Sequence, residues 1–576
     1  MSKLSELWGS ARSRADTSRI SRNSSLGPAL LFAAGTLCAS SFGASAAPVV
    51  ATQEGVVQGF INKGVAEFLG VPYAEPPIGK LRWKPSKKHE AWAGVLKATA
   101  FAPTCAQIVT LGVFAGPANN NEDCLYLNVF TPNLNPSAKL PVIFWIHGGG
   151  NVDGESNDYD ASKLASDGKT VVVTINYRLN LMGFLAHPAL DKEGHLFGNY
   201  GILDQQLALK WVKRNIAKFG GDKDNVTVGG QSAGATDTGI HVISPLSDGL
   251  FDRALYESSV PINELPLSLA ETRSTAFAVA AGCGAGTDSA TAKCLRGLTA
   301  AQIEALAGTA SGNSAYINGP LVDGTIIPIQ PIAAWHNGQF KHMPMMNGRV
   351  EDEQNFTLAI TEYFSGPPRA PLTAAQYTAS INATYSAPNP VAPGVPYPAG
   401  TAASILATYP VSAYASPQLA WDAAVTDLGA CATQHVNQIL APQTQYYAYE
   451  FDERTAPFYF PKMPGFVSLA YHTSDIQYLF PLYHGGSDGI IHSLNNKQED
   501  LSDQLVAAWT NFAWTGNPNG LGNYPWPHYV AGKKNAPNFL SENIPVLSTF
   551  TDAQYAANHK CAFWSGILPY TYGPAY

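Results

Sequence analysis

The residues Gly230-Gln231-Ser232-Ala233-Gly234 have the types and the spacing of a serine nucleophile on a sharp turn between a strand and a helix. A β-carbon would clash at both glycine positions, so glycine lets the turn close and the helix pack near the strand. The same spacing recurs at Gly485-Gly486-Ser487-Asp488-Gly489. The neighbouring elements must therefore decide which serine, if either, is a nucleophile.

The elements around Ser232 are those that a nucleophile needs. The run Asn225–Gly229 is short and β-branched, as in a buried parallel strand. Before it, apolar residues recur at helical spacing over Leu207–Ile216, and Gly220-Gly221 ends that helix. Helix, strand and turn follow in the order of an α/β-hydrolase. Ser487 follows an aromatic stretch with no strand before it, and we interpret it as a loop serine.

A second chemical feature is the run His147-Gly148-Gly149-Gly150, which directly follows the apolar run Pro141–Ile146. Glycines after a buried strand leave backbone N–H groups free to approach a substrate carbonyl, as in the oxyanion holes of lipases and esterases. We expect the N–H groups of Gly149, Gly150 and Ala233 to bind the oxyanion.

Apolar runs and helical stretches alternate along the chain. Pro141–Ile146 and Thr170–Asn176 are typical of central buried strands, and Val49–Val71 is typical of short strands separated by glycine. The alternation predicts an α/β fold with a central, mostly parallel sheet and helices on both faces. The segment from about Ser386 to Tyr409, rich in Pro and Ala, is predicted to be a surface loop; a domain linker is the alternative.

The composition sets broad limits. The chain has 576 residues, of which 45% are hydrophobic and 14% charged, against about 25% charged in typical domains. One large domain over residues 47–576 suits an α/β protein of this length. The net charge of −8 and the lack of a basic cluster in the body of the chain make nucleic acid an unexpected partner.

The first 46 residues have the pattern of a cleavable signal peptide. A long basic stretch precedes a short apolar one from Leu26 to Leu37, and Ala44-Ser45-Ala46 fits a cleavage site. We place the mature start near Ala47 and expect a secreted or periplasmic protein. A retained anchor is the alternative, although the apolar run is short and interrupted; no other segment would span a membrane.

Six cysteines remain after this segment, and six allow 15 pairings. Closure of the shortest loops favours the pairs Cys105–Cys124 and Cys283–Cys294, which leaves Cys431–Cys561. No Cys or His cluster has the spacing of a zinc site, so we expect no metal.

Long motifs carry a resemblance to the type-B carboxylesterase and lipase family, whose members are cholinesterase-like α/β-hydrolases. Within it, the chain resembles a bacterial-type secreted carboxylesterase. The matches extend over essentially the whole mature chain. The two most specific are Glu122–Pro132, which reads EDCLYLNVFTP, and Phe219–Gly234, which contains the serine pentapeptide.

The resemblance implies the remaining catalytic residues. The family's acid comes five positions after a glycine, which matches Glu353 after Gly348; by position alone, Glu351 and Asp352 are rivals. The family's histidine precedes an acidic residue by three positions, which matches His472 before Asp475. The order Ser232, Glu353, His472 is that of α/β-hydrolases.

Further family positions match less closely. His147 is the runner-up for the base, with a structural role at the glycine loop expected instead. Ser258 matches a serine that helps to hold the acid, although Ser259 replaces the usual glycine after it. The resemblance also implies two scaffold ion pairs. These are Arg82–Glu122 and Arg178–Asp204.

Two departures from the family bear on the substrate. Gln231 replaces a glutamate that many relatives have before the nucleophile, which removes a negative charge beside the reacting centre. Asn151 stands where Phe or Tyr is common, and we expect it to change the wall nearest the acyl group.

These observations predict a serine carboxylesterase that cleaves a small-molecule ester through an acyl-enzyme and needs no cofactor. An amide or carbamate hydrolase, a lipase, and a non-catalytic binding module on the same fold are the alternatives. The natural ester and the oligomeric state stay open. We expect the loops Gln107–Asn121, Glu264–Thr272 and Gly312–Pro328 to shape the substrate site.

Overall fold

The structure is a computed structural model. It describes residues 47–309, 312–313, 315–386, 396–520, 523–543 and 547–572. The predicted signal peptide, residues 1–46, lies outside the described residues. Contacts within residues 47–576 group them into one unit.

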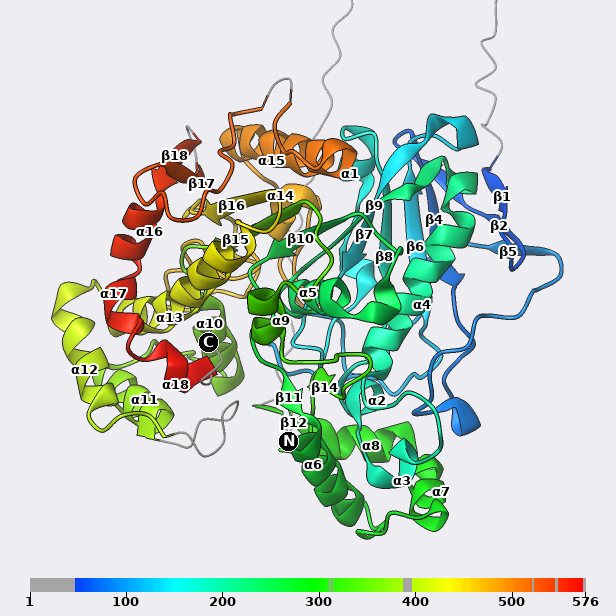
Figure 1. Cartoon of the computed structure of the whole chain (residues 1–576), viewed down its shortest axis with the longest axis horizontal. Helices are drawn as coiled ribbons and strands as arrows, with labels where there is room; N and C mark the ends of the chain where they lie inside the picture. The colour runs from blue at the N-terminus through cyan, green and yellow to red at the C-terminus, as the bar shows by residue number, and fades with distance from the viewer. Residues whose placement is uncertain are drawn as a thin grey trace, which may run out of the picture. The chain divides into compact units, whose positions relative to one another are not determined.

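A large sheet runs through this unit (Figure 1). Its strands, in spatial order, are β18 (Ser548–Thr551), β17 (Pro537–Glu542), β16 (Tyr446–Phe451), β15 (Met345–Val350), β10 (Arg253–Glu257), β9 (Gly221–Gln231), β7 (Leu140–Ile146), β8 (Val171–Ile175), β6 (Tyr126–Thr131), β4 (Val65–Pro72) and β3 (Phe60–Asn62). The seven strands from β17 to β8 are parallel, and antiparallel pairs close both edges.

Three smaller sheets accompany it among the described residues. They are β1 (Val49–Ala51) with β2 (Val56–Gln58) and β5 (Val95–Lys97), β11 (Leu265–Pro266) with β14 (Leu321–Val322), and β12 (Gly308–Thr309) with β13 (Gly312–Asn313).

The described helices follow the chain in this order: α1 (Ser162–Ser166), α2 (Asn180–Phe184), α3 (Pro188–Asp191), α4 (Tyr200–Asn215), α5 (Ala233–Ile243), α6 (Leu267–Ala280), α7 (Ser289–Gly297), α8 (Ala300–Ala307), α9 (Pro331–Asn337), α10 (Asn355–Ser365), α11 (Ala374–Ser386), α12 (Thr401–Thr408), α13 (Pro417–Leu440), α14 (Ile476–Leu479), α15 (Asn496–Thr515), α16 (Asp552–Asn558), α17 (Cys561–Trp564) and α18 (Leu568–Tyr572). None of the described helices is long and apolar enough to cross a membrane.

Helices cover both faces of the sheet, and β7 shows why. Successive side chains of a strand point to opposite faces. Val142, Phe144 and Ile146 belong to one hydrophobic cluster, with residues of α4 and α5. Ile143 and Trp145 belong to a second cluster, with residues of α1 and α15. A strand buried on both faces reads as one apolar run, so the prediction of a mostly parallel sheet between two helical layers is confirmed.

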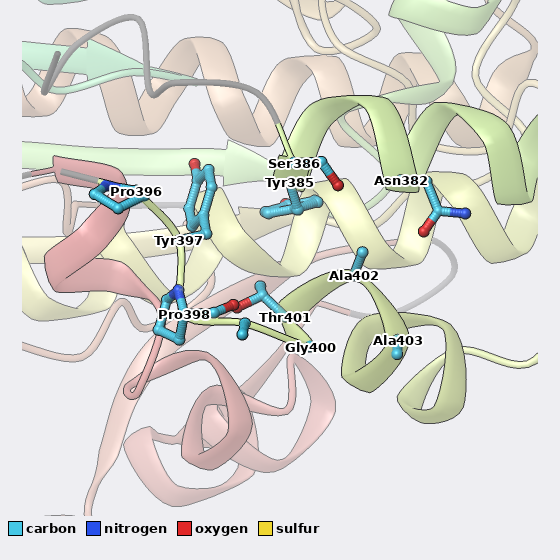
Figure 2. Close-up of a pocket in the computed structure, with 11 residues that line it drawn as sticks. Asn382, Tyr385, Ser386, Pro396, Tyr397, Pro398, Gly400, Thr401, Ala402 and Ala403 are labelled. Atoms are coloured by element: carbon cyan, nitrogen blue, oxygen red, sulfur yellow. The ribbon is translucent and has the colours of Figure 1, made fainter. Parts of the chain in front are cut away.

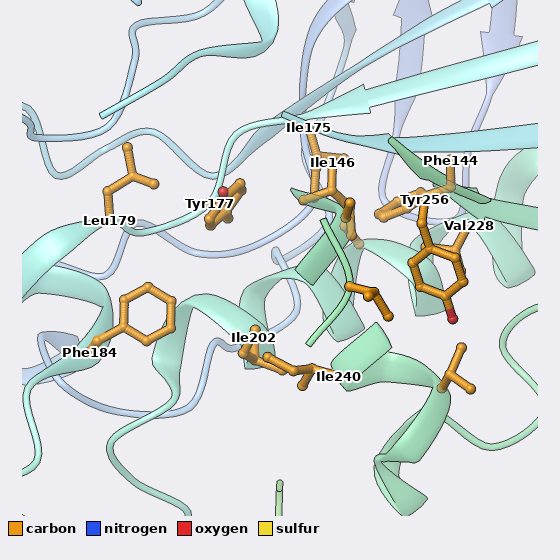
Figure 3. Packing of buried hydrophobic residues seen from close by; sticks show 14 of the residues in the cluster. Phe144, Ile146, Ile175, Tyr177, Leu179, Phe184, Ile202, Val228, Ile240 and Tyr256 are labelled. Carbon is orange, nitrogen blue, oxygen red and sulfur yellow. The ribbon is translucent and has the colours of Figure 1, made fainter. Parts of the chain in front are cut away.

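The first cluster holds the strands against the helices that position the serine (Figure 3). Phe144 and Val228 come from neighbouring strands, and Ile202 of α4 and Ile240 of α5 lie on the helical side. All four side chains are fully buried. Burial of each stabilises the fold by about 1.5–3 kcal/mol, so the strands and helices around the serine form a rigid frame.

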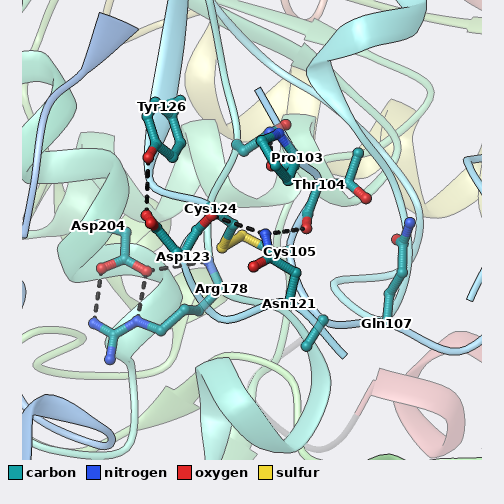
Figure 4. Close-up of a disulfide and its surroundings, with 12 residues drawn as sticks. Pro103, Thr104, Cys105, Gln107, Asn121, Asp123, Cys124, Tyr126, Arg178 and Asp204 are labelled. Atoms are coloured by element: carbon teal, nitrogen blue, oxygen red, sulfur yellow. Dashed lines mark hydrogen bonds and ion pairs between the residues drawn. A yellow bond between two sulfur atoms is a disulfide. The ribbon is translucent and has the colours of Figure 1, made fainter. Parts of the chain in front are cut away.

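The three predicted disulfides are present. They join Cys105 to Cys124, Cys283 to Cys294 and Cys431 to Cys561. Figure 4 shows the first of them, close to the predicted ion pair in which Arg178 Nε donates to Asp204 Oδ2 at 2.8 Å.

The other predicted ion pair is also present. Arg82 Nε donates to Glu122 Oε1 at 2.6 Å, and its NH1 group donates to the backbone oxygen of Leu298. Both charges are largely buried, at 8% and 13% side-chain exposure. The pair therefore ties the N-terminal segments to the loop after α7.

The prediction of a surface loop over Ser386–Tyr409 is partly wrong. Residues 387–395 lie outside the described residues, but Thr401–Thr408 forms helix α12. Good helix formers follow Gly400, whose positive φ of 86° starts the helix, and the prolines before it hid this signal. Figure 2 shows α12 and the end of α11 around a pocket of about 590 Å³, lined by Tyr385 and Tyr397.

Candidate active site

Ser232 lies on the sharp turn that the sequence predicts. Strand β9 ends at Gln231 and helix α5 begins at Ala233, so Ser232 alone makes the turn. Its backbone has φ 56° and ψ −123°, a region that residues with a β-carbon rarely adopt. Such strain persists only where the surroundings enforce it, and it is typical of functional positions.

The glycines on either side make this turn possible. A β-carbon on Gly230 would lie 2.4 Å from the oxygen of Ile146, and one on Gly234 would lie 2.0 Å from the same oxygen. Both distances are far below van der Waals contact. The sequence argument for two obligatory glycines is therefore confirmed.

The glycine loop lies beside this turn. Strands β7 and β9 are parallel neighbours with Ile146 opposite Gly230, so the segments that follow them emerge at the same edge of the sheet. A β-carbon on Gly148 would lie 3.1 Å from the β-carbon of Ser232. Gly149 and Gly150 have positive φ values of 110° and 62°, which turn the backbone of the loop.

The N–H groups of this loop are available as donors. Among the described residues, neither Gly149 nor Gly150 donates its N–H to another group. Ala233 is the first residue of α5, and the first N–H groups of a helix have no acceptor within the helix. The three predicted oxyanion donors therefore come from two segments at one edge of the sheet.

His472 and Glu353 are in direct contact. Glu353 follows β15 and is 2% exposed, and its Oε2 is hydrogen-bonded to His472 Nδ1. The backbone N–H of His472 also donates to the oxygen of Glu353 at 3.3 Å. Two segments 119 residues apart in the sequence are thus brought together as predicted.

The other nitrogen of His472 points to the serine turn. Gln231, the residue before Ser232, has its Nε2 3.1 Å from His472 Nε2. An amide nitrogen only donates, so His472 Nε2 accepts and the imidazole proton lies on Nδ1, against Glu353. This is the tautomer that a general base requires, although the lone pair here accepts from Gln231, and among the described residues no hydrogen bond joins His472 to Ser232 Oγ.

Glu353 is ionised in this environment. Burial raises the pKa of Glu353, but the nearby charges of His472 and Arg349 outweigh it, so the pKa lies below its ordinary value. The two neighbouring carboxyls that could replace it as the acid have another partner, since Glu351 and Asp352 both form ion pairs with Arg454.

Ser258 and His147 lie near the contact between Glu353 and His472 without being part of it. The hydroxyl of Ser258 is close enough to help lower the pKa of Glu353, but it has no hydrogen bond of good geometry among the described residues. His147 is stacked on Tyr177, and burial lowers its pKa to about 4. A histidine that stays neutral and is packed under the glycine loop suits a structural role.

Asn151 connects the glycine loop to another element. Its φ is 58°, which asparagine tolerates, and its side chain is 3% exposed. Asn151 Nδ2 donates to Asp237 Oδ1 of α5 at 3.0 Å. The side chain therefore ties the glycine loop to the nucleophile's helix.

Three phenylalanine rings, those of Phe114, Phe356 and Phe460, pack together beside His472, and we call them the phenylalanine wall. The sequence did not predict this contact. The ring of Phe356 lies 5.5 Å from that of His472, and Phe356 contacts Phe114 and Phe460. Phe114 belongs to the loop Gln107–Asn121, which was expected to shape the substrate site. The three phenylalanines come from distant segments, so no local spacing signals their contact.

The sheet, the strained serine turn and the histidine–carboxylate pair define the protein as a hydrolase of the α/β class. Comparison with known proteins gives the family. The model of the carboxylesterase family matches residues 46–564. The chain therefore belongs to the carboxylesterase family and is a carboxylic-ester hydrolase.

Several characterised proteins are similar over most of their length. Cocaine esterase of Oryctolagus cuniculus is 34% identical over 91% of this chain and 97% of its own. Acylcarnitine hydrolase of Mus musculus is 32% identical over 83% and 85%, respectively. The medium-chain fatty acyl-CoA hydrolase precursor of Anas platyrhynchos is 32% identical over 84% and 87%.

Proposed function

We propose that Ser232 is the nucleophile, His472 the general base and Glu353 the acid of this carboxylesterase. The observation that carries the proposal is the position of His472. One ring nitrogen is bound to buried Glu353, and the other faces Gln231, next to the strained serine. The loop serine Ser487 has no such surroundings, since it lies in a turn after Pro481.

The proposed reaction has two halves. Ser232 Oγ attacks the ester carbonyl while His472 Nε2 takes the hydroxyl proton, and the N–H groups of Gly149, Gly150 and Ala233 bind the oxyanion. The tetrahedral intermediate then expels the alcohol, which receives the proton from His472. Water then attacks the acyl-enzyme while His472 takes a proton from it, and the acid leaves as His472 returns that proton to Ser232 Oγ. Glu353 stabilises the histidine cation throughout.

The proposed substrate is a small-molecule ester with an acyl group that faces the phenylalanine wall. The relatives are named for hydrolysing cocaine, acylcarnitine and fatty acyl-CoA, so their names differ in the substrate that is cleaved. Gln231 also differs from the glutamate that many relatives have. We therefore carry over to this protein the hydrolysis of an acyl bond, and not the particular substrate of any relative.

We further propose an exported protein, secreted or periplasmic, of the bacterial type, with residues 1–46 removed and residues 47–576 as a single domain. Three disulfides support an oxidising compartment. The relatives reported above are vertebrate proteins, so the bacterial type rests on the resemblance read from the sequence alone. Mass spectrometry of the exported protein would locate its first residue.

The test is hydrolysis of a p-nitrophenyl ester by the wild type and by Ser232→Ala. We expect the substitution to lower kcat by a factor on the order of 10⁴ or more, with the fold intact by circular dichroism. Ser487→Ala is the matched control and should keep full activity. Equal activity of Ser232→Ala and the wild type would refute the assignment.

A panel of esters, amides and carbamates of different acyl and leaving groups would define the specificity. A preference for long-chain triglycerides would indicate a lipase, and a preference for amides or carbamates would move the protein to those hydrolases. Each result would leave the assigned residues in place.

A further inference from the structure

A buried arginine lies behind the proposed acid. Arg349 is on β15, four residues before Glu353, and its side chain is 12% exposed. Its Nε lies 3.5 Å from Glu353 Oε1, an ion pair without hydrogen-bond geometry. The other carboxylate oxygen of Glu353 is bound to His472. The carboxylate thus lies between a histidine and a guanidinium.

Helix α13 has a seat for this guanidinium. Arg349 NH1 donates to Thr433 Oγ1 at 3.0 Å. One turn earlier on the same helix is Gly429, where a β-carbon would lie 2.9 Å from NH2 and 3.0 Å from NH1. Glycine inside a helix lowers its stability, and here it gives the space that the guanidinium occupies. Two positions of α13 are therefore fitted to this one side chain.

The seat opens on one side into a pocket. Arg349, Gly429 and Thr433 line a pocket of about 200 Å³, together with Thr236 of the nucleophile's helix and Glu264. Water in this pocket can solvate the NH groups that face away from Glu353. A partly solvated guanidinium keeps its charge, so it can act on Glu353 at little desolvation cost.

We propose that Arg349 is a positioning residue of the active site, which keeps Glu353 ionised and its carboxylate turned to His472. The proposal rests on the proposed function of Ser232, Glu353 and His472. When His472 takes the serine proton it becomes a cation, and an ionised Glu353 must be ready beside it.

Several other groups bear on the charge of Glu353. The titratable groups around it, besides Arg349, are His472, Asp475 before α14, Tyr449 of β16 and Tyr555 of α16. Its polar neighbours are Ser258 after β10 and the backbone N–H of Val350, which donates to Glu353 Oε1 at 3.3 Å. Burial, and after it the charge of Glu353, raise the pKa of the buried Asp475 carboxyl to about 7. Arg349 is the permanent cation of this set, because a guanidinium stays protonated at any pH at which the protein is folded.

A purely structural role is the alternative, since Arg349 also ties β15 to α13. The two roles differ in what they change. A structural tie affects the melting temperature and leaves the pH profile of the folded enzyme unchanged. A positioning charge affects kcat and the acidic limb of the profile, because that limb reports the titration of the free enzyme's base.

The test compares the wild type with Arg349→Met and Arg349→Lys, using a p-nitrophenyl ester from pH 5 to 9. For Arg349→Met we expect kcat to fall by about tenfold at pH 7 with KM nearly unchanged, and the acidic limb to move up by about one pH unit. Arg349→Lys keeps the charge and should recover most of kcat. Thr433→Val removes one hydrogen bond of the seat and should give a smaller change in the same direction.

Arg214→Met is the matched control. Arg214 of α4 also forms a half-buried ion pair, with Glu54 at 3.2 Å, and should affect the melting temperature alone. An unchanged acidic limb in Arg349→Met would overturn the proposal. If Arg349→Met does not fold, the acidic limb of the pH profile of Thr433→Val tests the proposal in its place. Activity retained in Ser232→Ala would instead refute the proposed function.

Discussion

Two histidines of this protein contact buried carboxylates, yet their surroundings differ on one side of the ring. His472 has Glu353 on Nδ1 and the amide of Gln231 on Nε2. His559, between α16 and α17, has Asp427 on Nδ1 at 2.8 Å and Glu450 on Nε2 at 2.6 Å. The two sites thus share a histidine–carboxylate pair and differ in the second nitrogen.

The difference separates a general base from a histidine with a structural role. Burial lowers the pKa of His559, but the charges and hydrogen bonds of Glu450 and Asp427 outweigh it and raise the pKa to about 10. Both nitrogens of His559 therefore hold protons at neutral pH and accept none. The second nitrogen of His472 instead faces an amide donor, Gln231, the residue before the nucleophile. A histidine–carboxylate pair becomes catalytic only when the second nitrogen can accept a proton.

The largest expected effect is on activity at His472. We expect His472→Gln to lower kcat by a factor on the order of 10⁴ or more, because Ser232 loses the group that takes its proton. Steady-state hydrolysis of a p-nitrophenyl ester measures this. The melting temperature should change little, since His472 is at the edge of the core. His559→Gln, as the matched substitution, should keep the kcat of the folded enzyme.

A smaller expected effect is on stability at His559. We expect His559→Gln to lower the free energy of unfolding by about 3–5 kcal/mol near pH 6, because two buried carboxylates lose their cation. The folded pKa is raised from an ordinary value of about 6.5. The stabilisation is therefore complete below about pH 6.5 and is lost as the pH rises through about 10.

Urea unfolding of the wild type and His559→Gln at pH 6, 8 and 10 measures this difference. The two unfolding free energies should converge toward pH 10. A difference that stays constant over this range would show that the proton of His559 is not what stabilises the fold.

The smallest expected effect comes from Gln231→Glu, which gives His472 a carboxylate on both sides as His559 has. The new charge stabilises the protonated imidazole, so the acidic limb of kcat/KM should move up by about one pH unit. Activity at pH 6 should fall by up to about tenfold, and activity at pH 8 should change little. Gln231→Met, which adds no charge, should leave the position of the limb unchanged.

Local patterns predicted the parts of the site whose requirements are local. The glycines at 230 and 234 are needed by the turn itself, so their spacing signals it without knowledge of the rest of the fold. In the sequence, strand β9 is signalled by a β-branched run, and helix α4 by apolar residues at helical spacing. The segment with α12 was mistaken for a loop because its prolines are a stronger local signal than the short helix after them.

Contacts between distant segments were predicted by family resemblance or not at all. Glu353 and His472 follow from family motifs, since 119 residues separate them and no spacing rule joins them. The hydrogen bond from Asn151 to Asp237 was not predicted, because a buried amide can bond to many polar partners. The choice depends on which partner the packing brings near.

The sequence by itself determined the order of the elements, the strained serine turn, the glycine loop and the pairing of the cysteines. These follow from steric needs and periodicities within a few residues, or from closure of short loops. The tertiary structure alone decided that Arg349 lies against Glu353 in a seat made by Gly429 and Thr433, and that Gln231 reaches His472. Those contacts join separate elements, so they depend on how the strands and helices pack.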